Sequence, residues 1–170
     1  MPHIHVCSLP RVEATAKAIG ANRLVTLLNP ATAHMRPDAI PAEHHLVLGL
    51  SDIVEPLDGH VFPEAEHIQA LLAFARGWDR AAPMLIHCYA GVSRSTASAF
   101  IVACALEPAR DERHFAQAIR RDSPTATPNA RLVALADAAL GRDGRMSRAI
   151  EAIGRGVDCE EGVPFALEVG

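Results

Sequence analysis

The chain has 170 residues, of which 49% are hydrophobic and 21% are charged. A chain of this size and composition forms one globular domain with a substantial core, which excludes a disordered or fibrous protein. The 16 basic and 20 acidic residues give a formal net charge of −4, so a nucleic-acid partner, which requires a basic surface, is not expected.

The first half of the chain alternates predicted strands with predicted helices. Three segments are continuous apolar runs or alternate apolar with polar residues, which is typical of strands. Two others repeat apolar residues with the helical period, and in the second of these Ile68, Leu71 and Ala75 share one face. The predicted strands lie at residues 4–9, 23–29 and 45–50, the predicted helices at residues 12–19 and 63–75, and a turn-rich loop at residues 51–63.

The second half is predicted to be mostly helical. A short apolar strand at Met84–His87 leads through a tight loop into residues 95–106, which are apolar or small on every side and therefore predict a central buried helix. Asp111 and Asn129 are suitable N-caps for two further helices, and the spacing of apolar residues after Met146 predicts a third.

The order of these elements predicts an α/β fold, in which a small, mainly parallel sheet of four or five strands is flanked by helices. The active site is then expected at the carboxyl ends of the strands. No repeat or linker divides the chain, so one domain is expected over residues 1–155, followed by an acidic tail over residues 156–170. The tail sequence VPFALEV is expected either to dock as an extended segment or to fray.

The cysteines and the hydropathy of the sequence indicate the cellular compartment in which the protein is expected. The four cysteines, at positions 7, 88, 104 and 159, are too scattered for a disulfide framework, which predicts a reducing compartment. The first residues lack a basic segment followed by a long apolar one, and the most apolar run is far shorter than the roughly 20 residues of a membrane span. We therefore expect a cytoplasmic protein without a membrane partner. Lys17 is the only lysine beside 15 arginines, which suggests a GC-rich, bacterial source.

The most informative segment is HCYAGVSRST, residues 87–96, between a predicted buried strand and the predicted buried helix. A tight loop in this position directs successive backbone N–H groups and the positive end of the helix toward one point, which makes a concave anion site. Gly91 permits the backbone geometry that such a loop requires. Cys88, at the first position of the loop, then lies where its thiolate form is favoured.

Physical magnitudes indicate which groups have to stabilise that thiolate. Lowering a cysteine pKa from about 8.5 to about 5.5 requires roughly 4 kcal/mol, of which a helix dipole supplies about 0.3–2 kcal/mol. Hydrogen bonds from Ser95 and from the loop N–H groups have to supply the remainder. Arg94 lies six residues after Cys88, and its planar guanidinium can hold two oxygens of a tetrahedral oxyanion at once. A nucleophile and an anion clamp therefore share one loop.

The pattern HCxxGxxRS, formed by His87, Cys88, Gly91, Arg94 and Ser95, resembles the signature of the cysteine-based protein tyrosine phosphatases. The later segment RRDSPTATPN is similar to the Arg-then-Pro-Asn segment of the compact dual-specificity subgroup. The resemblance leaves out only the end of the chain, and it implies a protein tyrosine phosphatase-like fold. It also implies hydrolysis of phosphomonoesters through a phosphocysteine intermediate.

The resemblance implies a role for each signature residue. Cys88 would attack phosphorus, Ser95 would steady the departing thiolate, and His87 would orient the cysteine loop. Phosphoryl oxygens would be bound by Arg94 and by the backbone of Tyr89, Ala90, Gly91, Val92, Ser93 and Arg94. Neither a metal nor another cofactor is implied, because Arg94 and the loop N–H groups supply the positive charge.

The family also uses an aspartate on a movable loop to protonate the leaving oxygen and later to activate water. Asp52 matches it, because it stands just after a predicted strand end in LGLSDI. Asp58 and Glu55 lie on the same loop without that placement, and Asp58 remains an alternative. Gly59 and the neighbouring prolines suit a loop that hinges.

The substrate is expected to be a protein phosphorylated on tyrosine or on serine and threonine, or a small phosphomonoester. The chain lacks the N-terminal region that deepens the pocket in tyrosine-specific relatives, which favours a shallower, dual-specificity-like site. The signature loop has no Lys, unlike phosphoinositide-type relatives, and residues 1–150 carry balanced charges, which disfavours a polyanionic substrate. The sequence sets no oligomeric state.

Two other function classes stay open. The chain could bind phosphoproteins without turning them over, or it could be a sulfurtransferase that carries a persulfide on Cys88. Of the other cysteines, Cys7 lies on a neighbouring strand, where a disulfide with an oxidised Cys88 is a minor alternative to simple packing. The nine histidines, the His44 and His45 pair among them, match no zinc pattern and are expected to be solvated.

Overall fold

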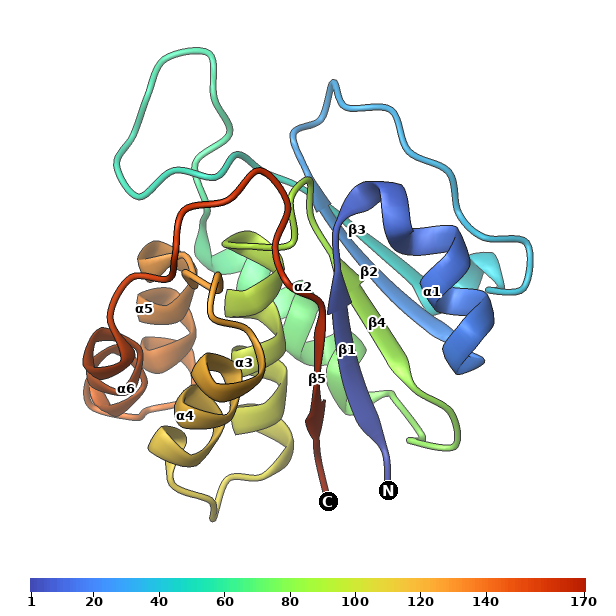
Figure 1. Ribbon diagram of the computed structural model, residues 1–170. Coiled ribbons are helices and arrows are strands. Elements are labelled where there is room, and N and C mark those ends of the chain that lie inside the picture. The colour runs from blue at the N-terminus through green and yellow to red at the C-terminus, as the bar shows by residue number, and fades with distance from the viewer.

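Five strands form one sheet in the computed structural model, which describes residues 1–170 (Figure 1). Their order across the sheet is β3-β2-β4-β1-β5, and only β5 runs antiparallel to its neighbour. The strands are β1 (His3–Cys7), β2 (Arg23–Leu28), β3 (His45–Gly49), β4 (Met84–His87) and β5 (Phe165–Glu168). The helices are α1 (Val12–Ile19), α2 (Ala65–Arg76), α3 (Arg94–Leu106), α4 (Glu112–Asp122), α5 (Ala130–Ala139) and α6 (Arg145–Ile153). Two short 3-10 turns lie at Leu9–Arg11 and Ala42–His44.

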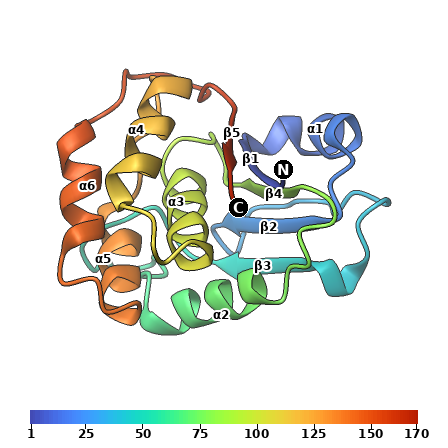
Figure 2. The same ribbon diagram turned by 90° about the horizontal axis from the view of Figure 1, so that it is seen from below.

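The helices divide unequally between the two faces of the sheet (Figures 1 and 2). Helix α1 packs on one face, where Val12 and Ala16 meet Leu24 and Leu85 in a small apolar cluster. Helices α2 to α6 form the layer on the other face, over the larger core. The centre of that layer is α3, which is buried from Arg94 to Cys104 as its apolar sequence predicts. The predicted α/β fold with a mainly parallel, helix-flanked sheet is therefore confirmed.

Local chemistry sets where the helices begin. The predicted N-caps are confirmed, because Asp111 accepts a hydrogen bond from the N–H of Arg113 at 2.8 Å and Asn129 accepts one from the N–H of Leu132 at 3.0 Å. Helix α2 begins at Ala65 rather than at residue 63. Its first turn is fixed by a capping box, in which Glu64 and the side chain of His67 bond to each other's backbone N–H groups.

The C-terminal segment, residues 156–170, docks in extended form and does not fray. Phe165–Glu168 pairs with β1, and Phe165, Leu167 and Val169 are buried against the larger core. The alternation of VPFALEV therefore serves an edge strand with one buried face. Before β5, this segment crosses the loop between β4 and α3, as Figure 1 shows. No helix combines the length and the apolar character that crossing a membrane requires.

Candidate active site

The loop that joins β4 to α3, residues 88–94, is called the signature loop here, and it lies at the carboxyl end of the central strand β4. Its carbonyl groups point outward, because several segments from distant parts of the sequence donate to them. In each of these hydrogen bonds a backbone N–H group donates to a carbonyl of the loop. The N–H of Leu9 donates to Tyr89 at 3.0 Å, that of Gly162 to Ala90 at 2.8 Å, that of Thr127 to Val92 at 2.9 Å and that of Asn129 to Ser93 at 3.1 Å. Four clamps thus fix the loop from its outer side.

The N–H groups of the same loop are left without protein acceptors. None of the six amides from Tyr89 to Arg94 donates a hydrogen bond within the chain. Buried backbone N–H groups are nearly always paired, and a tight loop of unpaired N–H groups that runs into a helix start is typical of an anion site. Gly91 is required for this shape: its φ is +73°, and a Cβ there would lie 2.9 Å from the carbonyl carbon of Cys7.

Cys88 lies at the start of the signature loop with only 2% of its surface exposed. Its Sγ is 3.1 Å from Oγ of Ser95, which is itself fully buried in the first turn of α3. The chain contains two other buried cysteines, and burial raises the pKa of Cys7 to about 11 and that of Cys104 to about 12. These two thiols are protonated at neutral pH, which makes them poor nucleophiles.

Arg94 is the last residue of this loop and is buried, with 7% of its surface exposed. One end of the guanidinium is fixed, because Nη1 donates to the carbonyl of Leu50 and to Oδ1 of Asn29, both at 3.0 Å. No carboxylate pairs with the charge, and Nε is buried without any hydrogen-bond partner. A buried cation with an unpaired donor is costly unless an anion completes it. The free Nε and Nη2 edge is the one that binds two oxygens at once.

Asp52 reaches the signature loop from the loop of residues 51–63, called the acid loop here. Its Oδ1 accepts hydrogen bonds from Oγ of Ser93 at 2.7 Å and from Nδ2 of Asn129 at 2.8 Å, and Oδ2 accepts none from the protein. Asp58 and Glu55 are exposed on the same loop and make no side-chain hydrogen bond. The structure therefore brings Asp52, and neither of the alternatives, to the signature loop.

The acid loop is fixed at its base and at Asp52 and Ile53, and its residues 54–60 make no hydrogen bond to the rest of the protein. The N–H of Ser51 donates to the carbonyl of Val61 at 2.9 Å, and Oγ of Ser51 accepts from the N–H of Val61 at 3.1 Å. Between these two residues nearly every side chain is exposed, including Val54 and Leu57. Both the acid loop and the signature loop lie at the same end of the molecule (Figure 1).

His87 is held inside the sheet. Its Nδ1 is 3.0 Å from the carbonyl of Cys88, and its Nε2 is 2.7 Å from Oγ1 of Thr26. Burial lowers the pKa of His87 to about 4, so the ring is neutral at pH 7. The same hydroxyl of Thr26 also contacts Nε2 of His45 at 2.8 Å. His45 is half-buried and therefore differs from the solvated residue that the sequence predicts, because its ring contacts Thr26 on the neighbouring strand β2.

Several residues around this site were not predicted from the sequence. Asn129 is the helix cap that the pattern indicates, but its amide also holds Asp52. Asn29 follows an apolar strand, and only the fold shows that it contacts Arg94. Gly162 lies in the C-terminal segment, and no local pattern indicates that it contacts the signature loop. The RRDSPTATPN resemblance is the one signal that points to Asn129.

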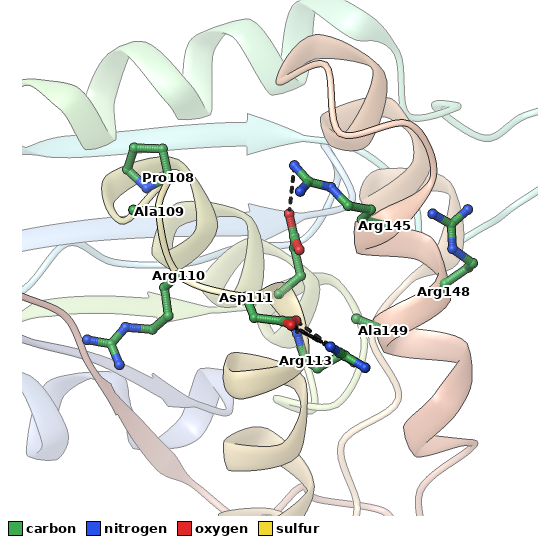
Figure 3. Close-up of a pocket in the computed structure, with 9 residues that line it drawn as sticks. Pro108, Ala109, Arg110, Asp111, Arg113, Arg145, Arg148 and Ala149 are labelled. Carbon is green, nitrogen blue, oxygen red and sulfur yellow. Dashed lines mark hydrogen bonds and ion pairs between the residues drawn. The ribbon is translucent and has the colours of Figure 1, made fainter.

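Two cavities deserve comparison. One of about 530 Å³ lies between the acid loop and the segment before α5, and Asp52, Ser93 and Asn129 line it. The other, also of about 530 Å³, lies past the far end of α3 and is lined by four arginines (Figure 3). There the acids Asp111 and Glu112 already pair with arginines, and no residue of the signature loop lines the cavity. The first cavity, in contrast, adjoins the signature loop through Ser93 and Asp52.

No family model matches the sequence, and no curated protein does either. Solved structures do match the fold. The PTP-2 phosphatase of Cydia pomonella is 20% identical with a TM-score of 0.61, over 79% of this chain and 84% of that one. Human DUSP28 is 16% identical with a TM-score of 0.61, over 82% and 88%. A mouse putative dual specificity phosphatase, solved with zinc tungstate, is 16% identical with a TM-score of 0.59, over 84% of both chains.

Proposed function

We propose that this chain, which has the fold of the cysteine-based protein tyrosine phosphatases, hydrolyses phosphomonoesters through a phosphocysteine intermediate. One observation carries the proposal. Arg94 is buried without a carboxylate, its Nε has no partner, and it adjoins a loop whose six N–H groups have no acceptor. A bound tetrahedral oxyanion satisfies all of these donors together, and Cys88 stands at the start of the same loop.

In the first step, Sγ of Cys88 attacks phosphorus and the bond from phosphorus to the ester oxygen breaks. Charge on the equatorial phosphoryl oxygens is stabilised by the loop N–H groups and by Nε and Nη2 of Arg94. Asp52 donates its proton to the leaving oxygen, and its hydrogen bond from Ser93 keeps the carboxyl group next to the signature loop.

In the second step, water attacks the phosphocysteine while Asp52 takes up a proton from it. The bond from sulfur to phosphorus breaks and inorganic phosphate leaves. Ser95, with its Oγ 3.1 Å from Sγ, donates a hydrogen bond to the departing thiolate. Because fixed donors supply all of the positive charge, the proposed chemistry proceeds without a metal ion.

The proposed substrates are phosphoproteins modified on tyrosine or on serine and threonine. The rim residue Tyr89 is 63% exposed, and exposed side chains of the acid loop line the neighbouring cavity. A rim of this kind supports an open site that admits both long and short phosphorylated side chains. Matched peptides that carry phosphotyrosine or phosphothreonine in one sequence, compared by kcat/KM, test this part of the proposal.

Hydrolysis of p-nitrophenyl phosphate in the presence of EDTA tests the central claim. The expected result is turnover by the wild type that survives the chelator, that orthovanadate inhibits and that Cys88→Ser abolishes. Cys159→Ser is the matched control, because Cys159 is exposed and makes no hydrogen bond, although it lines a cavity that Asp52 and Ser93 also line. This variant should retain wild-type turnover.

Other outcomes have defined meanings. Activity that Cys88→Ser leaves unchanged would overturn the mechanism. A folded wild type that binds tungstate and does not hydrolyse any phosphoester would favour a phosphoprotein-binding module. Cyanide-dependent turnover of thiosulfate would favour a sulfurtransferase that carries persulfide on Cys88.

A further inference from the structure

Three adjacent strands each contribute one polar side chain to a chain of hydrogen bonds that ends at the nucleophile's peptide. His45 starts β3, Thr26 lies on β2, and His87 ends β4. Thr26 and His87 are register partners, and both are almost fully buried. The Oγ1 of Thr26 is 2.8 Å from Nε2 of His45 and 2.7 Å from Nε2 of His87. These three residues are called the donor chain here.

The direction of every hydrogen bond in the donor chain follows from its last member. The carbonyl of Cys88 accepts only, so Nδ1 of His87 has to carry the proton in their 3.0 Å contact. A neutral His87 then has an unprotonated Nε2, which accepts the hydroxyl proton of Thr26. That hydroxyl has no second proton, so its oxygen accepts from a protonated Nε2 of His45. All three donors therefore point from the edge of the sheet toward Cys88.

The donor chain has a geometric consequence in the signature loop. The carbonyl of Cys88 and the N–H of Tyr89 belong to one planar peptide and point in opposite directions. Holding the carbonyl back on His87 therefore aims the first N–H of the signature loop into the anion site. Aligned hydrogen bonds polarise one another, so the hydroxyl of Thr26 strengthens the contact that His87 makes.

We propose that Thr26 and His45 are positioning residues for the reaction, which act through His87 to aim the Cys88–Tyr89 peptide at the bound phosphoryl group. This inference rests on the proposed function, and it assigns roles to two residues outside the signature. Neither residue belongs to the signature loop or to the acid loop.

The surroundings of His45 and His87 keep both rings neutral, and the donor chain requires this of His87, because its Nε2 has to accept the hydroxyl proton of Thr26. The ring of His34 lies edge-on to the ring of His45, with 6.0 Å between the ring centroids, and Arg36 follows His34 by two residues. Burial first, and then the coulombic effects of these two neighbours, lowers the pKa of His45 to about 4. His87 also faces His34, His45 and Arg94, each of which disfavours its charged form. At pH 7 both rings are therefore neutral, and the donor chain keeps one direction.

Two substitutions of Thr26 separate positioning from packing. Val keeps the shape of Thr and removes the hydroxyl, whereas Ser keeps the hydroxyl and removes a methyl group. If the donor chain positions the peptide, Thr26→Val lowers kcat for p-nitrophenyl phosphate about 10-fold and weakens tungstate binding by a similar factor. Thr26→Ser should restore both to within about threefold of wild type. If Thr26 only packs, Ser is the more damaging change, and that order would overturn the inference.

Two further variants complete the experiment. His45→Phe removes the outermost donor and should lower kcat about threefold, because the contact of Thr26 with His87 remains. His44→Gln is the matched control, since Nδ1 of His44 contacts the carbonyl of Asn22 and lies outside the donor chain. Thr26→Val with wild-type kcat and wild-type tungstate affinity would refute the positioning role. If the wild type has no turnover, the proposed function fails. The tungstate affinities of the wild type and of the Thr26 variants, measured by titration calorimetry, then still decide the role of Thr26.

Discussion

The substitution Gly162→Ala tests whether the C-terminal segment holds the signature loop in shape. A Cβ on residue 162 would lie 2.6 Å from the carbonyl oxygen of Gly91 and 3.0 Å from Cγ2 of Val92. Ordinary contact begins near 3.4 Å, so the two backbones have to separate by roughly the difference, 0.8 Å. Either the signature loop moves, or the N–H of Gly162 loses its 2.8 Å hydrogen bond to Ala90.

Both responses change the aim of the loop N–H groups. A misplacement of about 1 Å in an active site costs about 10²-fold in rate, so a shift shared between two segments should lower kcat about 10-fold. The accompanying loss in unfolding free energy should be about 1–3 kcal/mol, the usual cost of overpacking. The backbone of Gly162 lies outside the left-handed region, so Ala brings a steric change and no conformational strain.

The assay is steady-state hydrolysis of p-nitrophenyl phosphate, with urea unfolding of the same preparations. Gly77→Ala is the matched control, because its Cβ would lie 3.6 Å from the nearest atom, the carbonyl oxygen of Ala73, at a φ of −82°. It should leave kcat unchanged. A folded Gly162→Ala protein with kcat within twofold of wild type would show that the C-terminal segment does not position the loop.

Two further predictions concern the acid and the buried histidine. Asp52→Asn should lower kcat for phenyl phosphate, a poor leaving group, about 10²-fold or more with little change in KM, and Asp58→Asn should be silent; the reverse order would move the acid role to Asp58. Because burial holds the pKa of His87 near 4, the unfolded chain binds a proton there that the native state does not, between pH 6.5 and 4. His87 should therefore contribute roughly 3 kcal/mol to the fall in unfolding free energy as the pH is lowered through this window, in addition to the contribution of His45, whose pKa is also lowered. Urea unfolding at pH 7 and pH 4.5 measures it, and an equal fall in His87→Asn would contradict the assignment.

The sequence predicts the local elements well because their causes are local. Each of the predicted features depends on residues that are close together in the sequence. These features are the apolar periodicity of the helices, the caps Asp111 and Asn129, and the strand, tight loop and helix around Cys88. The strand order and the docking of β5 could not be predicted in the same way. The VPFALEV pattern is compatible with docking or fraying, and only β1, at the other end of the chain, supplies its partner.

The candidate site likewise has one part that the sequence predicts and one part that only the fold reveals. Cys88, Arg94 and Ser95 are recognisable from their spacing, because the anion site is built from consecutive residues. The residues that orient them come from other strands and loops. Thr26 is one polar residue in the apolar run RLVTLL, and its position gains meaning only from the register that sets it beside His87. The sequence predicts a solvated His45, because it does not show toward which face of the sheet the first side chain of a strand points.

The signature loop depends on the hydrogen bond from Gly162 to Ala90, so activity should be lost more easily than the fold. Strand β5 is an edge strand that pairs only with β1, and edges of this kind open locally at a free energy below that of global unfolding. When β5 and the preceding residues open, the signature loop loses the clamp, and the larger core loses Phe165, Leu167 and Val169 but keeps the residues of α2 to α6. Mild denaturant should therefore abolish activity at a lower concentration than the one that unfolds the whole protein. The activity that remains then measures how much of the peripheral strand β5 is still docked, and not how much of the core is folded.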